Sequence, residues 1–334
     1  MNNNSTLKPD TLQNGSQICI AVSCGDINGV APEIILKTHG FIRKLCRVQY
    51  AVHRELLEQA AGLLKLSVPD DIELIEPDAP VPDILPGRCT KESGKYSFAS
   101  FETALKQTEN DACGALVTMP VSKKAWQIAG IPYVGYTDAL SKRYGRQGIM
   151  TLGRPGFYVS LYTDHIPLKA VPDKLYEEEL SNFLLNLHAS ADAGSIAVTG
   201  LNPHAGEEGL LGQEDKLIRD VIGQVNRKIG REIYRGPFPG DSAFTPAMRR
   251  RFSHYVAMYH DQGLIPVKTL FFEEAVNISL NLPVKRVSPD HGTAFDIAYC
   301  NSPHLSCTSY IEAVKTAVRW ARREIFMSDI THNF

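Results

Sequence analysis

Short β-branched runs alternate along this chain with longer segments of helical periodicity, and this alternation is the feature that most limits its fold. Each run is long enough for one strand, and each following segment is long enough for a covering helix. Such alternation is typical of a parallel sheet with helices on its faces. The runs fall into two sets, which predicts two α/β units: 18–23, 48–53 and 113–119, then 157–163, 195–201 and 255–259.

The charge balance and the cysteine pattern exclude several classes of protein. The chain has 35 basic and 37 acidic residues, a net charge of −2, which favours neither nucleic acid nor a membrane surface as partner. No apolar stretch reaches the roughly 18 residues of a membrane span, and residues 1–16 do not resemble a signal peptide. Seven scattered cysteines without a C-x-x-C pair predict reduced thiols, so we expect a cytoplasmic protein.

A parallel α/β chain of this length raises the question of a Rossmann dinucleotide site. The fingerprint G-x-G-x-x-G after a strand is absent, and so is a Walker loop. The nearest glycine series, Gly206, Gly209 and Gly212, has the wrong spacing. A nucleotide bound to this chain therefore needs another binding geometry.

Three histidines each follow a predicted strand within a polar segment. They are His165 in YTDHIPLK, His204 in TGLNPHAGEEG and His260 in AMYHDQGLIPVK. Ligands gather at the carboxyl ends of parallel strands, so these imidazoles could converge there. Three neutral imidazoles that leave a coordination position open are typical of a catalytic metal site. The alternative is three unrelated loop histidines.

A second candidate cluster is cationic and polar. It contains the ammonium of Lys268, the amide of Asn277, the guanidinium fork of Arg286 and the hydroxyl of Thr137. Together these groups suit a small anion of multiple charge. The alternative is that each of them is a solvated surface residue.

Nine segments of the chain form a longer pattern: CGDINGVAPEIILK, TMPVSKKAW, VGYTDAL, HIPLKAVPD, TGLNPHAGEEGLLGQED, GPFPGDSAF, AMYHDQGLIPVK, VNISLNLP and SPDHGTAFDIA. In this order they resemble the motifs of the 4-hydroxythreonine-4-phosphate dehydrogenase family of pyridoxal phosphate biosynthesis. The resemblance runs from about Ile18 to Ala317. Its most specific parts are LNPHAGE, MYHDQG and DHGTA, which occur in the same order as in the family.

The resemblance implies a fold like that of isocitrate and isopropylmalate dehydrogenases, in which two α/β/α domains flank a cleft. That fold binds NAD by loops, which accounts for the absent Rossmann fingerprint. Residues 17–128 together with 288–334 are expected to form the first domain. Residues 129–287 are expected to form the second domain, with the metal and the dimer interface. Residues 1–16, rich in Asn and Ser, are expected to be a disordered tail.

The resemblance also implies roles for individual residues. The metal ligands are His165, His204 and His260, at a site shared between the subunits of a homodimer. Lys268 and Asp241 are candidates for moving protons. The remaining assignments are Tyr136, Thr137, Lys268, Asn277 and Arg286 for the substrate, and Gly292, Thr293 and Ala294 for the cofactor.

One position departs from the family pattern. The family usually has Gly-His-Thr where this chain has Gly135, Tyr136 and Thr137. Tyrosine keeps a donor and an aromatic ring but carries no positive charge near neutral pH. Two alternative substrates of similar relatives therefore stay open: phosphorylated four-carbon acids such as threonate or erythronate, and a cyclic dihydrodiol dicarboxylate.

The implied reaction is oxidation of 4-phosphooxy-L-threonine at C3 by NAD or NADP, followed by decarboxylation to 3-amino-2-oxopropyl phosphate and CO2. One divalent ion (Zn, Mg or Co) would act as the Lewis acid for both steps. Two alternatives of other classes stay open. A metal-dependent hydrolase could use the same histidines with Asp261 and no cofactor, and a non-catalytic protein could bind a ligand in the cleft.

Overall fold

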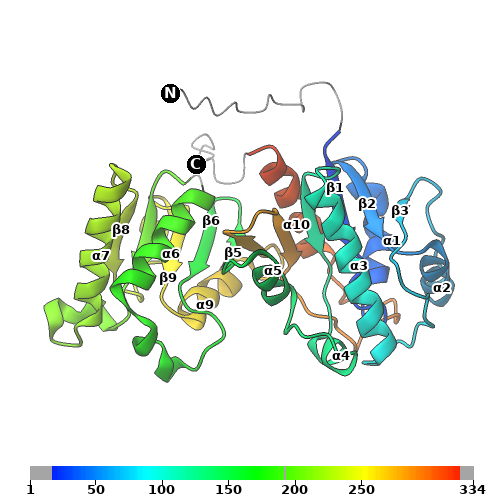
Figure 1. Cartoon of the computed structure of the whole chain (residues 1–334), viewed down its shortest axis with the longest axis horizontal. Coiled ribbons are helices and arrows are strands. Elements are labelled where there is room, and N and C mark those ends of the chain that lie inside the picture. The colour runs from blue at the N-terminus through cyan, green and yellow to red at the C-terminus, as the bar shows by residue number, and fades with distance from the viewer. Residues whose placement is uncertain (1–16, 192, 324–334) are drawn as a thin grey trace, which may run out of the picture.

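The computed structural model describes residues 17–191 and 193–323. In it, helices pack against a single mixed sheet. The sheet has 11 strands in the order β3-β2-β1-β4-β11-β10-β5-β6-β9-β7-β8 (Figure 1). The predicted α/β class is confirmed. The tail predicted for residues 1–16 lies outside the described residues. Of the helices within the described ranges, none is long and apolar enough to cross a membrane.

One half of the sheet is parallel, and its strands β1 and β4 are buried. Strand β1 pairs with β2 and β4, β2 pairs with β3, and β11 pairs with β4. Every residue of β1 and β4 is buried, as expected for parallel strands covered on both faces. The first elements are β1 Cys19–Ser23, α1 Ala31–Ile42, β2 Arg47–Ala51, α2 Arg54–Leu64, β3 Glu73–Ile75, α3 Lys91–Glu109, β4 Ala115–Thr118, α4 Lys123–Ile128 and α5 Tyr136–Tyr144.

The other half contains four strands, β6, β9, β7 and β8, which are also parallel. Helices α6 and α7 pack against each other beside them. The elements of the middle of the chain are β5 Ile149–Arg154, β6 Phe157–Leu161, the 3-10 turns η1 Leu168–Ala170 and η2 Pro172–Lys174, α6 Glu177–Ser190, β7 Ile196–Thr199, η3 Pro203–Gly209, α7 Glu214–Ile229, β8 Tyr234–Phe238, α8 Pro246–Arg249, β9 His254–Ala257 and α9 His260–Phe271.

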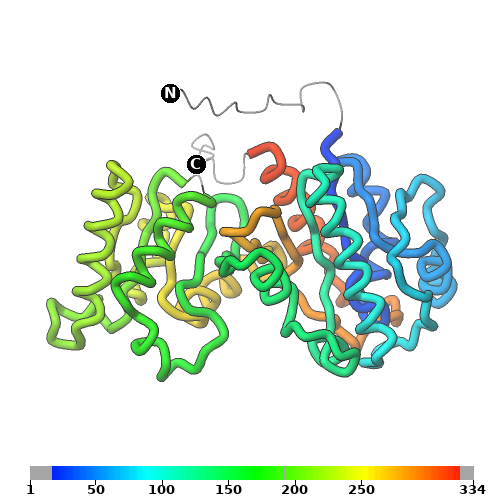
Figure 2. Tube along the Cα trace, viewed as in Figure 1, coloured from blue at the N-terminus to red at the C-terminus, as the bar shows by residue number. Residues whose placement is uncertain are grey.

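Antiparallel pairing joins the two halves. Strand β10 (Val276–Leu280) pairs with β11 (Arg286–Pro289) and with β5, and β5 pairs with β6. The middle of the sequence forms one half, whereas the first third and the last segments, including α10 (Thr308–Ala321), form the other (Figure 2). One hydrogen-bonded sheet runs through both halves, and the predicted domain boundaries stay a prediction.

The expectation that all cysteines are reduced thiols is wrong for one pair. Cys19 and Cys113 form a disulfide, although they lie 94 positions apart in the sequence. Cys19 begins β1, and Cys113 precedes β4, the parallel neighbour of β1. Spacing along the sequence does not report which strands are neighbours, so it did not reveal this pair. The free thiols are Cys24, Cys46, Cys89, Cys300 and Cys307.

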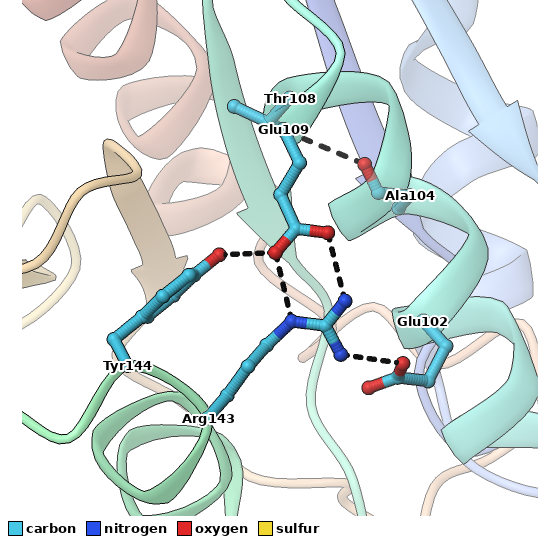
Figure 3. A network of polar contacts seen from close by, with 6 residues as sticks. All are labelled: Glu102, Ala104, Thr108, Glu109, Arg143 and Tyr144. Atoms are coloured by element: carbon cyan, nitrogen blue, oxygen red, sulfur yellow. Dashed lines mark hydrogen bonds and ion pairs between the residues drawn. The ribbon is translucent and has the colours of Figure 1, made fainter.

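A polar network fixes helix α5 against α3 (Figure 3). Arg143 donates from Nε and Nη2 to the two carboxylate oxygens of Glu109, at 2.7 and 2.8 Å, and from Nη1 to Glu102 at 3.0 Å. The Tyr144 hydroxyl also donates to Glu109, at 2.7 Å. A bidentate pair of this kind sets an orientation as well as a distance. The network therefore positions the opposite end of α5, which begins at Tyr136.

Candidate active site

The three site histidines follow three adjacent parallel strands. Strand β9 lies between β6 and β7, and His165, His204 and His260 come shortly after β6, β7 and β9 respectively. The imidazoles of His165 and His260 approach each other, with ring centroids 5.3 Å apart. His165 and His260 thus meet at the carboxyl edge of the sheet, where ligands of open α/β sheets bind.

His165 and His260 open into a cavity of about 670 Å³, called here the arginine cavity. Gly292, from the predicted cofactor loop, also lines it, whereas Thr293 and Ala294 are not part of this lining. The substrate residues predicted from the sequence all lie on its wall: Tyr136, Thr137, Lys268, Asn277 and Arg286.

His204 and Asp241 lie in a neighbouring depression of about 650 Å³, the His204 hollow, which Gln262 also lines. Within the described residues, no three His, Cys, Asp or Glu side chains gather closely enough to hold a metal ion. One copy of the chain therefore brings together two of the three predicted ligands and presents the third nearby.

The backbone that carries His204 is a left-handed turn. His204, Ala205, Gly206, Glu207 and Glu208 all have positive φ, between 41° and 78°. This conformation costs roughly 1–2 kcal/mol for each residue with a side chain. Periodicity in the sequence does not predict such a turn.

Asp215, in the first turn of α7, compensates part of that cost. It is buried and accepts hydrogen bonds from the amides of Leu201 and Asn202, at 2.8 and 3.1 Å. A third bond, of 2.9 Å, comes from the Asn202 side chain. Three donors on one buried carboxylate hold the start of the His204 loop against α7.

A side-chain amide connects the ends of β7 and β9. Gln262 accepts at Oε1 from Thr199 Oγ1 and from the Met258 amide, and donates from Nε2 to the Gly200 carbonyl, each at 2.7 Å. Thr199 and Gly200 lead into the His204 loop, and Gln262 lies in the same helix turn as His260. The amide thus fixes the two histidine-bearing segments relative to each other.

Each of the three histidines has an acidic side chain near Nδ1. The distance is 2.8 Å from His260 to Asp261 Oδ1, and 2.7 Å from His204 to Glu207 Oε1. For His165 it is 3.9 Å, to Asp164. A carboxylate that receives the Nδ1 proton leaves the Nε2 lone pair available to a ligand. Burial lowers the pKa of His165, whereas the hydrogen bond to Glu207 raises the pKa of His204.

Arg286 supplies a buried positive charge to the arginine cavity. Its side chain donates from Nε and Nη2 to Thr118 Oγ1, at 2.9 and 2.8 Å, and from Nη1 to Ser279 Oγ at 3.2 Å. No carboxylate among the described residues forms an ion pair with it. Burial lowers the pKa of Arg286 to about 10, and the nearby Tyr136 opposes this shift. A guanidinium with only neutral partners is suited to a bound anion.

Lys268 and Asn277 add further polar groups to this wall. Lys268 Nζ donates to Asp290 Oδ2 at 2.5 Å, a contact between α9 and the segment after β11. Asn277 Oδ1 is buried and has no hydrogen-bond partner within the described residues. The cavity therefore offers both a paired ammonium and an unsatisfied acceptor.

The predicted cofactor loop packs closely on the loop after β1. The Thr293 carbonyl accepts from the Val30 amide at 3.0 Å. A Cβ on Gly29 would lie 2.6 Å from the same carbonyl oxygen, so glycine is required for this approach. Beside Gly292, by contrast, the position of a Cβ is open space.

Comparison with known proteins shows which family the chain is part of. Residues 38–317 match the family model described as "Pyridoxal phosphate biosynthetic protein PdxA". The 4-hydroxythreonine-4-phosphate dehydrogenases of Campylobacter fetus and Sulfurimonas denitrificans are 47% and 43% identical, over 90% and 92% of this chain and 97% and 99% of theirs. The crystal structure of the Klebsiella pneumoniae enzyme superposes with a TM-score of 0.78 at 29% identity, covering 92% of this chain and 99% of that one.

The chain belongs to the PdxA family. This membership confirms the resemblance predicted from the nine sequence segments.

Sequence reasoning missed the residues that hold the PdxA-family motifs in place. Gln262 and Asp290 lie within the segments MYHDQG and SPDHGTA, so their motifs were recognised but their contacts were not. Asp215 belongs to GLLGQED, and it reads as an ordinary acidic residue at a helix start. Their hydrogen bonds to distant segments, which the structure shows, distinguish these residues from ordinary polar residues.

Proposed function

We propose that this chain oxidises 4-phosphooxy-L-threonine at C3 with NAD or NADP and then releases CO2 to give 3-amino-2-oxopropyl phosphate. This places it in pyridoxal 5′-phosphate biosynthesis, as a cytoplasmic homodimer. The family supports a dehydrogenase of this substrate class. The observation that carries the proposal is Arg286, a buried guanidinium without a carboxylate partner, in one cavity with His165, His260 and Lys268.

In this proposal Arg286 binds the anionic end of the substrate. Three of its five N–H donors are used by Thr118 and Ser279, so two remain. Thr137 adds a hydroxyl, and Asn277 Oδ1 can accept a hydrogen bond from an ammonium or hydroxyl group of the substrate.

His165, His204 and His260 supply the imidazole donors that a divalent metal takes. Glu207 and Asp261 hydrogen-bond to Nδ1 of His204 and His260, which leaves Nε2 of these two rings available to the metal. Imidazole donors favour Zn or Co over Mg. When bound, the cation supplies Lewis acidity at the C3 oxygen during both oxidation and CO2 loss.

A nicotinamide cofactor would supply the hydride acceptor, and no atom of the described residues fills the space beside Gly292. Gly292, Thr293 and Ala294 would hold the cofactor, on a loop fixed by the contact of Thr293 with Val30.

Lys268 is the proposed proton carrier within the cavity. Its Nζ is an ammonium held by Asp290, so it can donate a proton to the substrate from a fixed position. Asp241 is proposed for the same task, but it lies in the His204 hollow. It acts on the substrate only if the hollow and the cavity meet.

A homodimer would bring the hollow and the cavity together. Exposed apolar side chains lie at the His204 hollow: Ile265 is 64% exposed, Leu270 is 39% exposed, and Leu210, just after the His204 loop, is 83% exposed. Covering such a surface with a second copy removes apolar area from water. His204 and Asp241 of one subunit would then complete the site of the other.

The proposal is tested by turnover of 4-phosphooxy-L-threonine, phosphothreonate, phosphoerythronate and a cyclic dihydrodiol dicarboxylate, with NAD and with NADP. We expect reduced cofactor and CO2 in equal amounts, with the highest kcat/KM for 4-phosphooxy-L-threonine. A higher kcat/KM for a phosphorylated sugar acid, or for a dihydrodiol dicarboxylate, would show that the proposed substrate is wrong. Hydrolysis without a cofactor would show that the chain is not a dehydrogenase.

A further inference from the structure

We infer that Tyr136 is a positioning residue for Arg286: its ring supports the anion-binding guanidinium, and its hydroxyl does not bind the substrate. The inference rests on the proposed function, because it requires that Arg286 binds an anion. It assigns to Tyr136 a role different from that of a direct ligand contact.

The hydroxyl of Tyr136 already has a partner in the protein. It donates to the carbonyl of Met119 at 2.9 Å, and the residue is only 7% exposed. The one proton that a phenol can donate is therefore used by the backbone. Burial also holds the pKa of Tyr136 well above its ordinary value, so the hydroxyl keeps this proton at neutral pH.

Two aromatic neighbours prevent the ring from turning toward a ligand. The ring centroid of Tyr136 lies 5.2 Å from that of Trp126, in an edge-to-face arrangement, and 4.9 Å from that of Phe101. Both neighbours are buried in the same apolar cluster. To reach the cavity centre with its hydroxyl, Tyr136 would have to leave these contacts and the Met119 carbonyl.

The face of the ring is directed at Arg286. The guanidinium carbon lies 5.3 Å from the ring centroid of Tyr136, within the range of a cation–π interaction. The other protein partners of this guanidinium are the hydroxyls of Thr118 and Ser279. The ring, Thr118 and Ser279 thus fix the guanidinium from different sides without neutralising it.

The absence of a neutralising partner matters for the ligand. A carboxylate in the place of Tyr136 would hold Arg286 equally well but would cancel the charge that attracts an anion. An aromatic ring attracts the cation through its quadrupole and leaves the net charge at +1. Tyr136 therefore keeps Arg286 both ordered and charged for an anionic group of the substrate.

The test separates the ring from the hydroxyl, with inorganic phosphate as the binding probe and 4-phosphooxy-L-threonine as the substrate. Tyr136→Phe keeps the ring, whereas Tyr136→Leu and Tyr136→Met remove it. We expect Tyr136→Phe to bind phosphate within about twofold of wild type, although loss of the Met119 hydrogen bond lowers its Tm. We expect both ring-free variants to raise the phosphate Kd and the substrate KM about tenfold, with kcat changed much less.

Tyr133 provides a matched control. It also faces a cation, with Lys142 Nζ 5.5 Å from its ring centroid, and it stacks on Phe98 beside the same aromatic cluster. It does not line the arginine cavity. Tyr133→Leu should therefore leave the phosphate Kd unchanged.

Three results would overturn the inference. Equal losses in Tyr136→Phe and the ring-free variants would show that the hydroxyl contacts the ligand. Wild-type affinity in Tyr136→Leu and Tyr136→Met would show that the ring is dispensable. Wild-type protein that binds neither phosphate nor substrate would remove the anion site itself, and with it the proposed function; this outcome differs from the first two because it needs no variant.

Discussion

His254 begins β9 and is fully buried, shortly before the site residue His260. Its Nε2 lies 2.8 Å from Ser160 Oγ, and burial lowers the pKa of His254 to about 3. In the folded protein it is neutral at any ordinary pH, whereas in the unfolded chain it takes up a proton near pH 6.5. In the unit formed by β9 and α9, His254 is thus a core residue, whereas His260 belongs to the candidate site.

The buried imidazole predicts how stability depends on pH. Between about pH 6.5 and 3 the unfolded state binds one more proton at His254 than the folded state, so the free energy of unfolding falls as the pH is lowered. We expect a wild-type loss of a few kcal/mol between pH 7 and 4 from this residue, and a shallower slope in His254→Gln. Urea unfolding at intervals over this range measures both slopes.

The buried carboxyl of Asp26 changes the free energy of unfolding in the opposite direction as the pH is lowered. Burial raises its pKa to about 6, so it favours the folded state more at low pH than at neutral pH, with the change between about pH 4 and 6. Comparing wild type with His254→Gln cancels this contribution. Identical slopes in the two proteins would exclude His254 as a source of acid sensitivity.

At the scale of elements, the sequence predicted that His165 and His260 lie together. Each of them follows a predicted strand, and parallel strands end at one edge of a sheet. The left-handed turn at His204 could not be predicted, because it depends on Asp215 in the next helix. The separation of His204 from His165 and His260 also lay beyond the sequence pattern.

Gln262 gives a prediction at this scale. In Gln262→Glu, the donor that faces the Gly200 carbonyl becomes a second acceptor, so the β7 and β9 ends repel each other at this point. We expect the affinity for Co²⁺ or Zn²⁺ to fall at least tenfold, as for other residues that orient metal ligands. Equilibrium dialysis of the purified protein measures this affinity.

Gln127→Glu is the matched control, since Gln127 is exposed on α4 and is not part of the lining of the arginine cavity or the His204 hollow. It makes the same amide-to-acid change and should leave metal affinity unaltered. Unchanged affinity in Gln262→Glu as well would mean that this amide has no influence on the histidines.

At the scale of the whole molecule, the two depressions predict a shared site. His204→Ala and Lys268→Ala should each be inactive alone, because each removes one half of every site. A heterodimer of the two variants contains one intact site, made from the unaltered His204 of one subunit and the unaltered Lys268 of the other. Random exchange should restore about a quarter of wild-type activity.

Activity after mixing, with subunit exchange verified by native mass spectrometry, measures this recovery. Persistent inactivity of verified heterodimers would show that His204 and Lys268 act within one subunit. The sequence indicated sharing only through its family resemblance; in the structure, the separation of His204 from its partners supports it independently.

The continuous sheet also limits how the two halves of the molecule can move. Strands β5, β10 and β11 carry main-chain hydrogen bonds from one half to the other without a gap. Arg286 lies on β11 and pairs with Ser279, and Asn277 lies on β10 and pairs with Ser288. A movement of one half relative to the other would therefore have to twist this ribbon, and Arg286 and Asn277, which lie on it, would be displaced less than residues far from it.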